Sequence, residues 1–148
     1  MYIGSFGLGA WLCGLAFIDR HSGQKAAQTI NKIMMDLKKK DIKLWVFPEG
    51  TRRSTGEIHE FKKGAFHAAI HAQVPIVPVV FSNYQGFLDS NKKIFNDGEV
   101  IITALPEIST KGMTTEDVNK LIEKTKSAMI EAFNQSSKEV AVHALKME

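Results

Sequence analysis

Three short apolar runs, separated by segments with helical periodicity, set the strongest limit on how this 148-residue chain can fold. The runs at 42–47, 74–80 and 100–105 are rich in β-branched and aromatic residues, which predicts a buried strand over 42–47 and further strands over 75–82 and 100–105. Helical patterns precede or follow each run. Strands that alternate with helices are typical of βαβ units. We therefore expect an α/β fold with a mostly parallel sheet flanked by helices.

Three helices are expected from caps and from apolar residues three and four positions apart. The first begins at Ser22 and ends near Lys39, the second covers 63–73, and the third is capped by Thr114 or Thr115. The apolar stripe of the third helix consists of Val118, Leu121, Ile122, Thr125, Met129 and Phe133. From Gln135 the sequence is polar, so we expect a domain over 1–134 and a frayed C-terminal tail over 135–148.

The N-terminal segment 1–18 carries no charge and is nearly as long as a membrane span. Its four glycines and Ser5 lower its hydrophobicity and its helix preference. We expect a short apolar helix or loop, followed by a strand that ends at Asp19 and Arg20. The large apolar side chains of this segment can pack in a core or touch a membrane surface.

Composition is that of an ordinary globular domain, with 44% hydrophobic and 24% charged residues. The net charge is +3 and the basic residues occur as doublets, among them Arg52-Arg53 and Lys62-Lys63. Such doublets are attracted to anionic membrane surfaces. The single cysteine, Cys13, excludes an internal disulfide and is consistent with a reducing, cytosol-facing location.

The hexapeptide Phe-Pro-Glu-Gly-Thr-Arg at 47–52 places a carboxylate, a glycine and an arginine where the first expected strand ends. Ligand sites of α/β sheets lie at the carboxyl ends of strands. Arg52 can bind a phosphate bidentately, Gly50 lets the backbone approach a ligand closely, and Glu49 can orient the guanidinium or accept a hydroxyl. The motif predicts a pocket for a phosphorylated, hydroxyl-bearing molecule. The alternative is an ordinary strand exit with a surface ion pair.

Two further segments support the pocket. Residues 14–20 form an apolar run that ends at Arg20, so a second arginine follows a strand. The run 74–80 contains Pro75 and Pro78, and Pro78 implies a sheet edge or a bulge because proline cannot donate to a ladder. We expect the strand ends to converge, with Arg20 and Arg52 on one anion site.

These three segments together resemble the glycerolipid acyltransferases, specifically the 1-acyl-glycerol-3-phosphate acyltransferases. Segments 14–20, 47–52 and 74–80 are similar to the second, third and fourth sequence blocks of that family, and the resemblance extends over 3–133. It implies a substrate-phosphate site formed by Arg20, Glu49, Gly50, Thr51 and Arg52. It also implies an acyl or acyl-CoA side formed by Val74, Pro75, Ile76 and Pro78.

The first block of the family, a histidine followed five positions later by an aspartate, has no counterpart in this sequence. None of the five histidines has an aspartate at that spacing, and His143 is followed by Glu148. The resemblance therefore implies a partial acyltransferase domain over 1–134, incomplete at its N-terminus and without catalytic residues. His67 and His71 are one helical turn apart, but no third ligand is near them in sequence, so we expect no metal site.

The resemblance implies transfer of an acyl group from acyl-CoA to lysophosphatidic acid, which gives phosphatidic acid in phospholipid biosynthesis. In the family the histidine is the general base and the aspartate orients it, so this chain alone should be inactive. Acyl-CoA is a co-substrate, and we expect no other cofactor and no nucleic-acid partner. The implied location is the endoplasmic reticulum membrane, cytosol-facing or monotopic. The alternatives are a non-catalytic phospholipid- or phosphate-binding regulatory module, or a phosphate-handling enzyme in which Arg20 and Arg52 serve another reaction.

Overall fold

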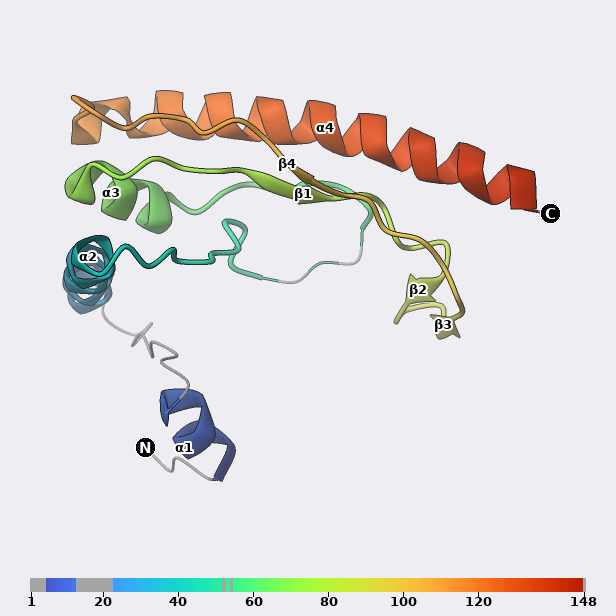
Figure 1. Cartoon of the computed structure of the whole chain (residues 1–148), viewed down its shortest axis with the longest axis horizontal. Helices are drawn as coiled ribbons and strands as arrows, with labels where there is room; N and C mark the ends of the chain where they lie inside the picture. Colours follow the sequence, from blue (N-terminus) through green and yellow to red (C-terminus); the bar gives the residue numbers. More distant parts are fainter. Residues whose placement is uncertain (1–4, 13–22, 52, 54, 148) are drawn as a thin grey trace. The chain divides into compact units, whose positions relative to one another are not determined.

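The computed structural model describes residues 5–12, 23–51, 53 and 55–147, and the chain falls into two compact units, Met1–Leu44 and Trp45–Glu148 (Figure 1). The first unit contains helices α1 (Ser5–Leu12) and α2 (Gly23–Lys39). The second contains helix α3 (Lys63–Ala72), strands β1 (Val79–Phe81), β2 (Leu88–Asp89), β3 (Ile94–Phe95) and β4 (Ile102–Ala104), the 3-10 turn η1 (Thr115–Asp117) and helix α4 (Val118–Met147). None of the described helices is both long and apolar enough to cross a membrane.

Helix α2 confirms the first expected helix. Its last turn carries Lys38 and Lys39, which complement the helix dipole. Asp41 then adopts a left-handed φ of 51°, and the Ile42 N–H donates to the Leu37 carbonyl at 2.9 Å. This is the Schellman pattern, which satisfies carbonyls that the helix end leaves unpaired. The expected cap, Ser22, lies outside the described residues, as does the strand expected up to Arg20.

The prediction of a buried strand over 42–47 is wrong. This segment has no strand pairing, and its apolar side chains are exposed, with Ile42 at 52% and Phe47 at 71% of full exposure. A strand is stable only when a neighbour accepts and donates its backbone hydrogen bonds, and no described segment pairs with this one. The apolar run is present, but within the described residues it has no partner strand.

The core of the second unit lies where α3 and α4 pack together (Figure 1). Phe66 and Ile70 of α3 are buried, as their helical spacing predicted. The Phe66 ring stacks on Phe61, with ring centroids 6.1 Å apart. The buried apolar residues of this cluster are Phe61, Phe66, Ile70, Ile108, Val118, Leu121 and Ile122. The apolar stripe of helix α4 therefore packs in the core, as its sequence predicted. It contacts α3 and Phe61, which precedes α3.

The described strands pair antiparallel, which corrects the expected parallel sheet. Strand β1 pairs with β4 in the register Val80 with Thr103, and β2 pairs with β3 as a short hairpin. No helix lies between β1 and β4, because the chain returns to β1 through the β2–β3 hairpin. Parallel strands need a crossover connection, usually a helix, whereas this return makes the pair antiparallel. Strands were expected over 75–82 and 100–105, and each expected range contains one, but the paired strands are only three residues long and they run antiparallel.

Strand β1 presents a buried face and an exposed face. Val80 and Ser82 are buried, and the Ser82 hydroxyl accepts the Ile101 N–H at 3.0 Å. Phe81 and its partner Ile102 are exposed. Pro78 precedes the strand and uses only its carbonyl, which accepts the Leu105 N–H at 2.9 Å. Among the described residues β1 has a neighbour on one side only, so it is the edge strand that Pro78 predicted.

Helix α4 is longer than its sequence suggested. It continues to Met147 through the segment expected to be a frayed tail, so that expectation is wrong. The start of this segment contacts the rest of the unit. Ser136 is buried, and its hydroxyl donates within the helix to the Ala132 carbonyl at 2.8 Å. The Ser137 hydroxyl accepts the Asn83 N–H at 2.9 Å, which is a tertiary contact. The domain boundary at residue 134 stays a prediction.

The start of η1 is held by Asp117. Its carboxylate accepts hydrogen bonds from the Thr114 N–H at 2.8 Å and the Thr114 hydroxyl at 3.2 Å, so Thr114 is the cap. The backbone hydrogen bond from Thr114, followed by its hydroxyl, lowers the pKa of Asp117 below its usual value. Both bonds are stronger to the ionised carboxylate than to the protonated one.

The Asp117 cap predicts a loss of stability in acid. A carboxylate whose pKa is lowered on folding stabilises the fold above its unfolded pKa of about 3.9, and this contribution disappears as the pH falls through the lower, folded value. In Asp117→Asn the unfolding temperature should therefore change less between pH 5 and pH 2 than in the parent chain. Thermal unfolding followed by circular dichroism measures this. Equal pH dependence in Asp117→Asn and the parent chain would contradict the prediction, and Glu116→Gln is the control.

Candidate functional site

The segment 48–62, which carries the Pro-Glu-Gly-Thr-Arg motif, is a loop whose two ends meet. The Lys62 N–H donates to the Pro48 carbonyl at 2.8 Å, and the Gly50 N–H donates to the Phe47 carbonyl at 3.1 Å. The Glu49 carboxylate accepts the His59 N–H at 3.2 Å across the loop. A compact loop closed by its own contacts can hold functional groups without secondary structure. We call residues 48–62 the motif loop.

Gly50 is required at the base of the motif loop. Its φ of +67° is a conformation that other residues rarely adopt. A Cβ at this position would lie 3.0 Å from Cδ of Lys62. The Lys62 stem therefore lies against Gly50, which brings a second cation to the part of the loop where the sequence predicted a phosphate site. Sequence spacing indicated Lys62 only as a flanking residue.

The structure leaves part of the predicted phosphate site undescribed. Glu49 is half-buried at the loop base, and Gly50 and Thr51 are exposed beside it. Arg20 and Arg52 lie outside the described residues. The described part of the site is therefore the carboxylate–glycine base, and the convergence of the two arginines stays a prediction.

A hydroxyl–imidazole pair in the motif loop was missed by sequence reasoning. The Thr55 hydroxyl oxygen is 2.5 Å from Nε2 of His59. His59 is half-buried, and its backbone N–H donates to the Glu49 carboxylate. In the sequence, His59 is only one of five histidines, none of which has an aspartate five positions later. The spacing of four between Thr55 and His59 predicts contact in a helix, but this segment is not helical, so no sequence signal pointed to the pair.

Helix α4 supports the motif loop from the side. The Lys126 ammonium forms an ion pair with Glu60, and Ile58 packs against the core cluster. A cleft of about 260 Å³ separates the loop from the helix. It is lined by Gly56, Glu57, Ile58, Ile130, Phe133 and Asn134. One side of the loop is therefore anchored to the core, whereas Thr51, Arg53 and Thr55 remain exposed.

The four residues expected on the acyl side lie between α3 and the segment that follows β4. The Val74 carbonyl accepts the Thr110 hydroxyl at 2.8 Å, and Ile76 forms an antiparallel bridge with Ile108. Pro75 is exposed, and Pro78 is buried. These contacts make Ile76 and Pro78 part of the packed unit. A role in acyl binding stays a prediction.

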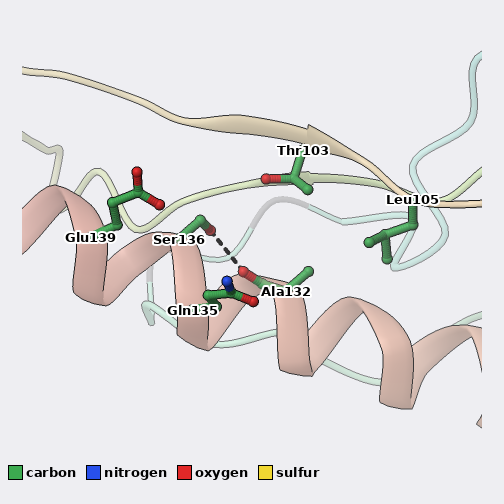
Figure 2. Close-up of a pocket in the computed structure, with 6 residues that line it drawn as sticks. All are labelled: Thr103, Leu105, Ala132, Gln135, Ser136 and Glu139. Atoms are coloured by element: carbon green, nitrogen blue, oxygen red, sulfur yellow. Dashed lines mark hydrogen bonds between the residues drawn. The ribbon is translucent and has the colours of Figure 1, made fainter.

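A second cleft, of about 270 Å³, lies between β4 and α4 (Figure 2). Figure 2 shows Thr103 and Leu105 on the strand side and four helix residues opposite them. The lining residues are Thr103, Leu105, Ala132, Gln135, Ser136 and Glu139. Glu139 is the single ionisable group among them, and no residue of the Pro-Glu-Gly-Thr-Arg motif takes part. We therefore read it as a packing groove.

No group of three or more metal-ligating side chains occurs within the residues that the structure describes. His67 is half-buried on α3, and His71, one turn later, is exposed.

The chain is similar to known acyltransferases. A family model described as Acyltransferase matches residues 1–82. The human 1-acyl-sn-glycerol-3-phosphate acyltransferase alpha is 40% identical over 137 residues, which cover 93% of this chain and 48% of that protein. The 1-acyl-sn-glycerol-3-phosphate acyltransferase of Saccharomyces cerevisiae is 40% identical over 126 residues, which cover 84% of this chain and 42% of that protein.

A solved structure agrees with these sequences. The crystal structure of the 1-acyl-sn-glycerophosphate acyltransferase from Thermotoga maritima matches with a TM-score of 0.61 at 23% identity, over 86% of this chain and 52% of that one. This likeness confirms an acyltransferase-like fold. The chain spans about half the length of the relatives that it matches. The family model covers more than half of the 148 residues, so this chain belongs to the acyltransferase family, and the relatives that it resembles are 1-acyl-sn-glycerol-3-phosphate acyltransferases.

Proposed function

We propose that this chain supplies the lysophosphatidic-acid-binding part of an acyltransferase that uses acyl-CoA to make phosphatidic acid. The motif loop carries the proposal. It holds Glu49 and Gly50 at a closed base, with the Lys62 stem against the glycine and Arg52 two residues further on. Guanidinium and ammonium groups beside exposed backbone are the usual partners of a phosphate.

In the proposed reaction, the free hydroxyl of lysophosphatidic acid attacks the thioester carbonyl of acyl-CoA. The new C–O ester bond forms as the C–S bond breaks, and the hydroxyl proton passes through a general base to the leaving CoA thiolate. The residues of this chain bind and orient the substrate phosphate. The His-x4-Asp pair that the resemblance implies as the base is absent from this sequence. We therefore propose that the chain binds the substrate but, alone, transfers acyl groups poorly or not at all.

The absence of the His-x4-Asp pair from this sequence also favours a second candidate, a non-catalytic phospholipid- or phosphate-binding regulatory module. Such a module needs the phosphate site and a membrane-facing surface but no base. Trp45 and Phe47 are exposed directly before the motif loop, and Arg53 and Lys62 are exposed within it. Exposed aromatic and basic side chains are typical of membrane interfaces. We propose the cytosolic surface of the endoplasmic reticulum membrane as the location.

We also propose that one segment borders the path of the acyl chain. It contains Val74, Pro75, Ile76 and Pro78.

Binding to lysophosphatidic acid tests the phosphate site directly. Arg52→Ala should weaken binding to phosphatidylcholine vesicles that contain lysophosphatidic acid by about tenfold or more, because a hydrogen-bonded charge pair contributes roughly 1.5–3 kcal/mol. Vesicle flotation with the full chain measures this.

The control variant is Lys111→Ala, which removes one charge from an exposed loop that lacks the motif. Vesicles with lysophosphatidylcholine, which also has one acyl chain but no net charge, are the control lipid. An equal loss in Arg52→Ala and Lys111→Ala would show attraction by net charge only and would contradict a built phosphate site.

A further inference from the structure

The motif loop contains a hydroxyl that the proposed acyl transfer does not use. Thr55 is exposed, and the sequence before it reads Arg52-Arg53-Ser54. We propose that Thr55 is a phosphorylation site for an arginine-directed Ser/Thr protein kinase, and that the phosphate is held by His59. This inference goes beyond the proposed function, because the modification needs neither lipid nor acyl-CoA.

The segment around Thr55 is suited to a kinase. Arg53 and Thr55 are exposed, and the described residues from 53 to 60 contain neither helix nor strand. A kinase can therefore bind this segment without breaking a backbone ladder. Kinases select substrates by charge patterns, and one class with an acidic groove selects arginines two and three positions before the acceptor. Arg52 and Arg53 occupy these positions relative to Thr55, but not relative to Ser54.

The structure also provides a partner for the added phosphate. Nε2 of His59 lies 2.5 Å from the Thr55 hydroxyl oxygen, the atom that would carry the phosphorus. His59 is fixed by its N–H bond to Glu49 and by its neighbour Ile58, which packs against the core. A phosphate adds a charge of about −1.5 to −2 and three strong acceptor oxygens. A protonated imidazole beside the phosphorylated hydroxyl can donate to one of them.

The modification would give the motif loop a net negative charge. Its three basic residues, Arg52, Arg53 and Lys62, balance its three acidic ones, Glu49, Glu57 and Glu60. A phosphate on Thr55 makes the net charge of the loop about −1.5 to −2. An anionic headgroup would then be repelled from the base of the loop. This consequence, unlike the modification itself, rests on the proposed function.

ATP is the phosphoryl donor in the proposed modification. The Thr55 hydroxyl oxygen attacks the γ-phosphorus, an O–P bond forms, and the bond to the ADP oxygen breaks. The hydroxyl proton passes to the base of the kinase.

Phosphate mapping tests the site. The full chain is incubated with the catalytic subunit of cAMP-dependent protein kinase and Mg-ATP, and phosphopeptides are mapped by mass spectrometry. Incorporation into Ser54→Ala should match that of the parent chain, whereas Thr55→Ala and Arg53→Ala should each lose about tenfold. Phosphate on Ser54, or equal incorporation in Thr55→Ala and the parent chain, would overturn the proposal.

A second measurement tests the contact between the phosphate on Thr55 and His59. The ³¹P resonance of the phosphorylated chain is titrated between pH 4 and pH 8, in the parent and in His59→Gln, which keeps the N–H that Glu49 accepts. The midpoint should lie lower in the parent, because the imidazolium stabilises the dianion. Equal midpoints would overturn the contact with His59.

Vesicles containing lysophosphatidic acid separate this inference from the proposed function. If the unmodified chain binds and the phosphorylated chain does not, the regulatory consequence is supported. If both bind equally, that consequence is wrong. If the unmodified chain does not bind at all, the proposed function fails, while the mapped phosphate and the midpoint still decide the Thr55 site.

Discussion

The purified 148-residue chain, given acyl-CoA and lysophosphatidic acid, is expected to form phosphatidic acid about 10²–10⁴-fold more slowly than an intact relative, because a positioned general base contributes a factor of that size. The sequence contains no histidine followed five positions later by an aspartate. Among the described histidines, His59 is directed at the Thr55 hydroxyl, and His143 lies 3.7 Å from Glu99 near the end of α4. A general base in the motif loop would need a histidine ring that a carboxylate holds in place there, and neither His59 nor His143 meets this condition.

The measurement is acyl-CoA-dependent formation of labelled phosphatidic acid, with the human acyltransferase alpha as the positive control. Turnover at the rate of that enzyme would show that another group in this chain supplies the base. His59→Gln, His67→Gln and His71→Gln would then identify it, and His59 is the first choice because it lies in the motif loop. Such a result would leave the family membership unchanged.

The helices could be predicted because their signals are local. The spacing of Phe66 and Ile70 gave the buried face of α3, and Thr114 gave the cap before α4. Each signal involves residues within one or two turns of each other, where side-chain contact follows from helix geometry alone.

The strand pairing could not be predicted because partners are chosen over long distances in the sequence. The runs at 75–82 and 100–105 were correctly identified, but β1 and β4 are antiparallel because of a hairpin that intervenes. The run at 42–47 has strand composition, yet no described segment pairs with it. Composition shows that a segment can form a strand, and only the rest of the fold decides whether it does.

Of the candidate site, the turn at Gly50 was predicted, since glycine and the following polar residues indicate a turn. The assignment of Glu49 and Gly50 to a phosphate site stays a prediction. The closure between Pro48 and Lys62, and the pair of Thr55 and His59, depend on a loop path with no periodicity. The ion pair of Lys126 with Glu60 joins residues that are far apart in sequence, so it also had no local signal.

Replacement of Leu121 by alanine should cause one of the largest losses of stability of any single substitution in the second unit. Leu121 is 1% exposed and belongs to the cluster that joins α4 to α3. Removal of a buried leucine side chain costs about 2–5 kcal/mol, against a total stability of about 5–15 kcal/mol for a typical domain. Alanine has the best helix propensity, so the loss reports packing and not a weaker helix. Urea unfolding followed by circular dichroism gives the free energy of unfolding.

The matched control is Val142→Ala on the same helix, because Val142 is 50% exposed and lies outside both the cluster and the cleft beside the motif loop. It should cost about 1–2 kcal/mol less than Leu121→Ala, since part of its surface is already in water. Equal losses would mean that α4 does not pack as described.

Leu121→Ala also tests whether the core holds the motif loop in place. Phe61 belongs to the cluster that contains Leu121, and Ile58 packs against it, so amide hydrogen exchange at His59 should accelerate in Leu121→Ala and stay unchanged in Val142→Ala. Unchanged exchange in both variants would mean that the loop is held by its own hydrogen bonds and not by the core beneath it.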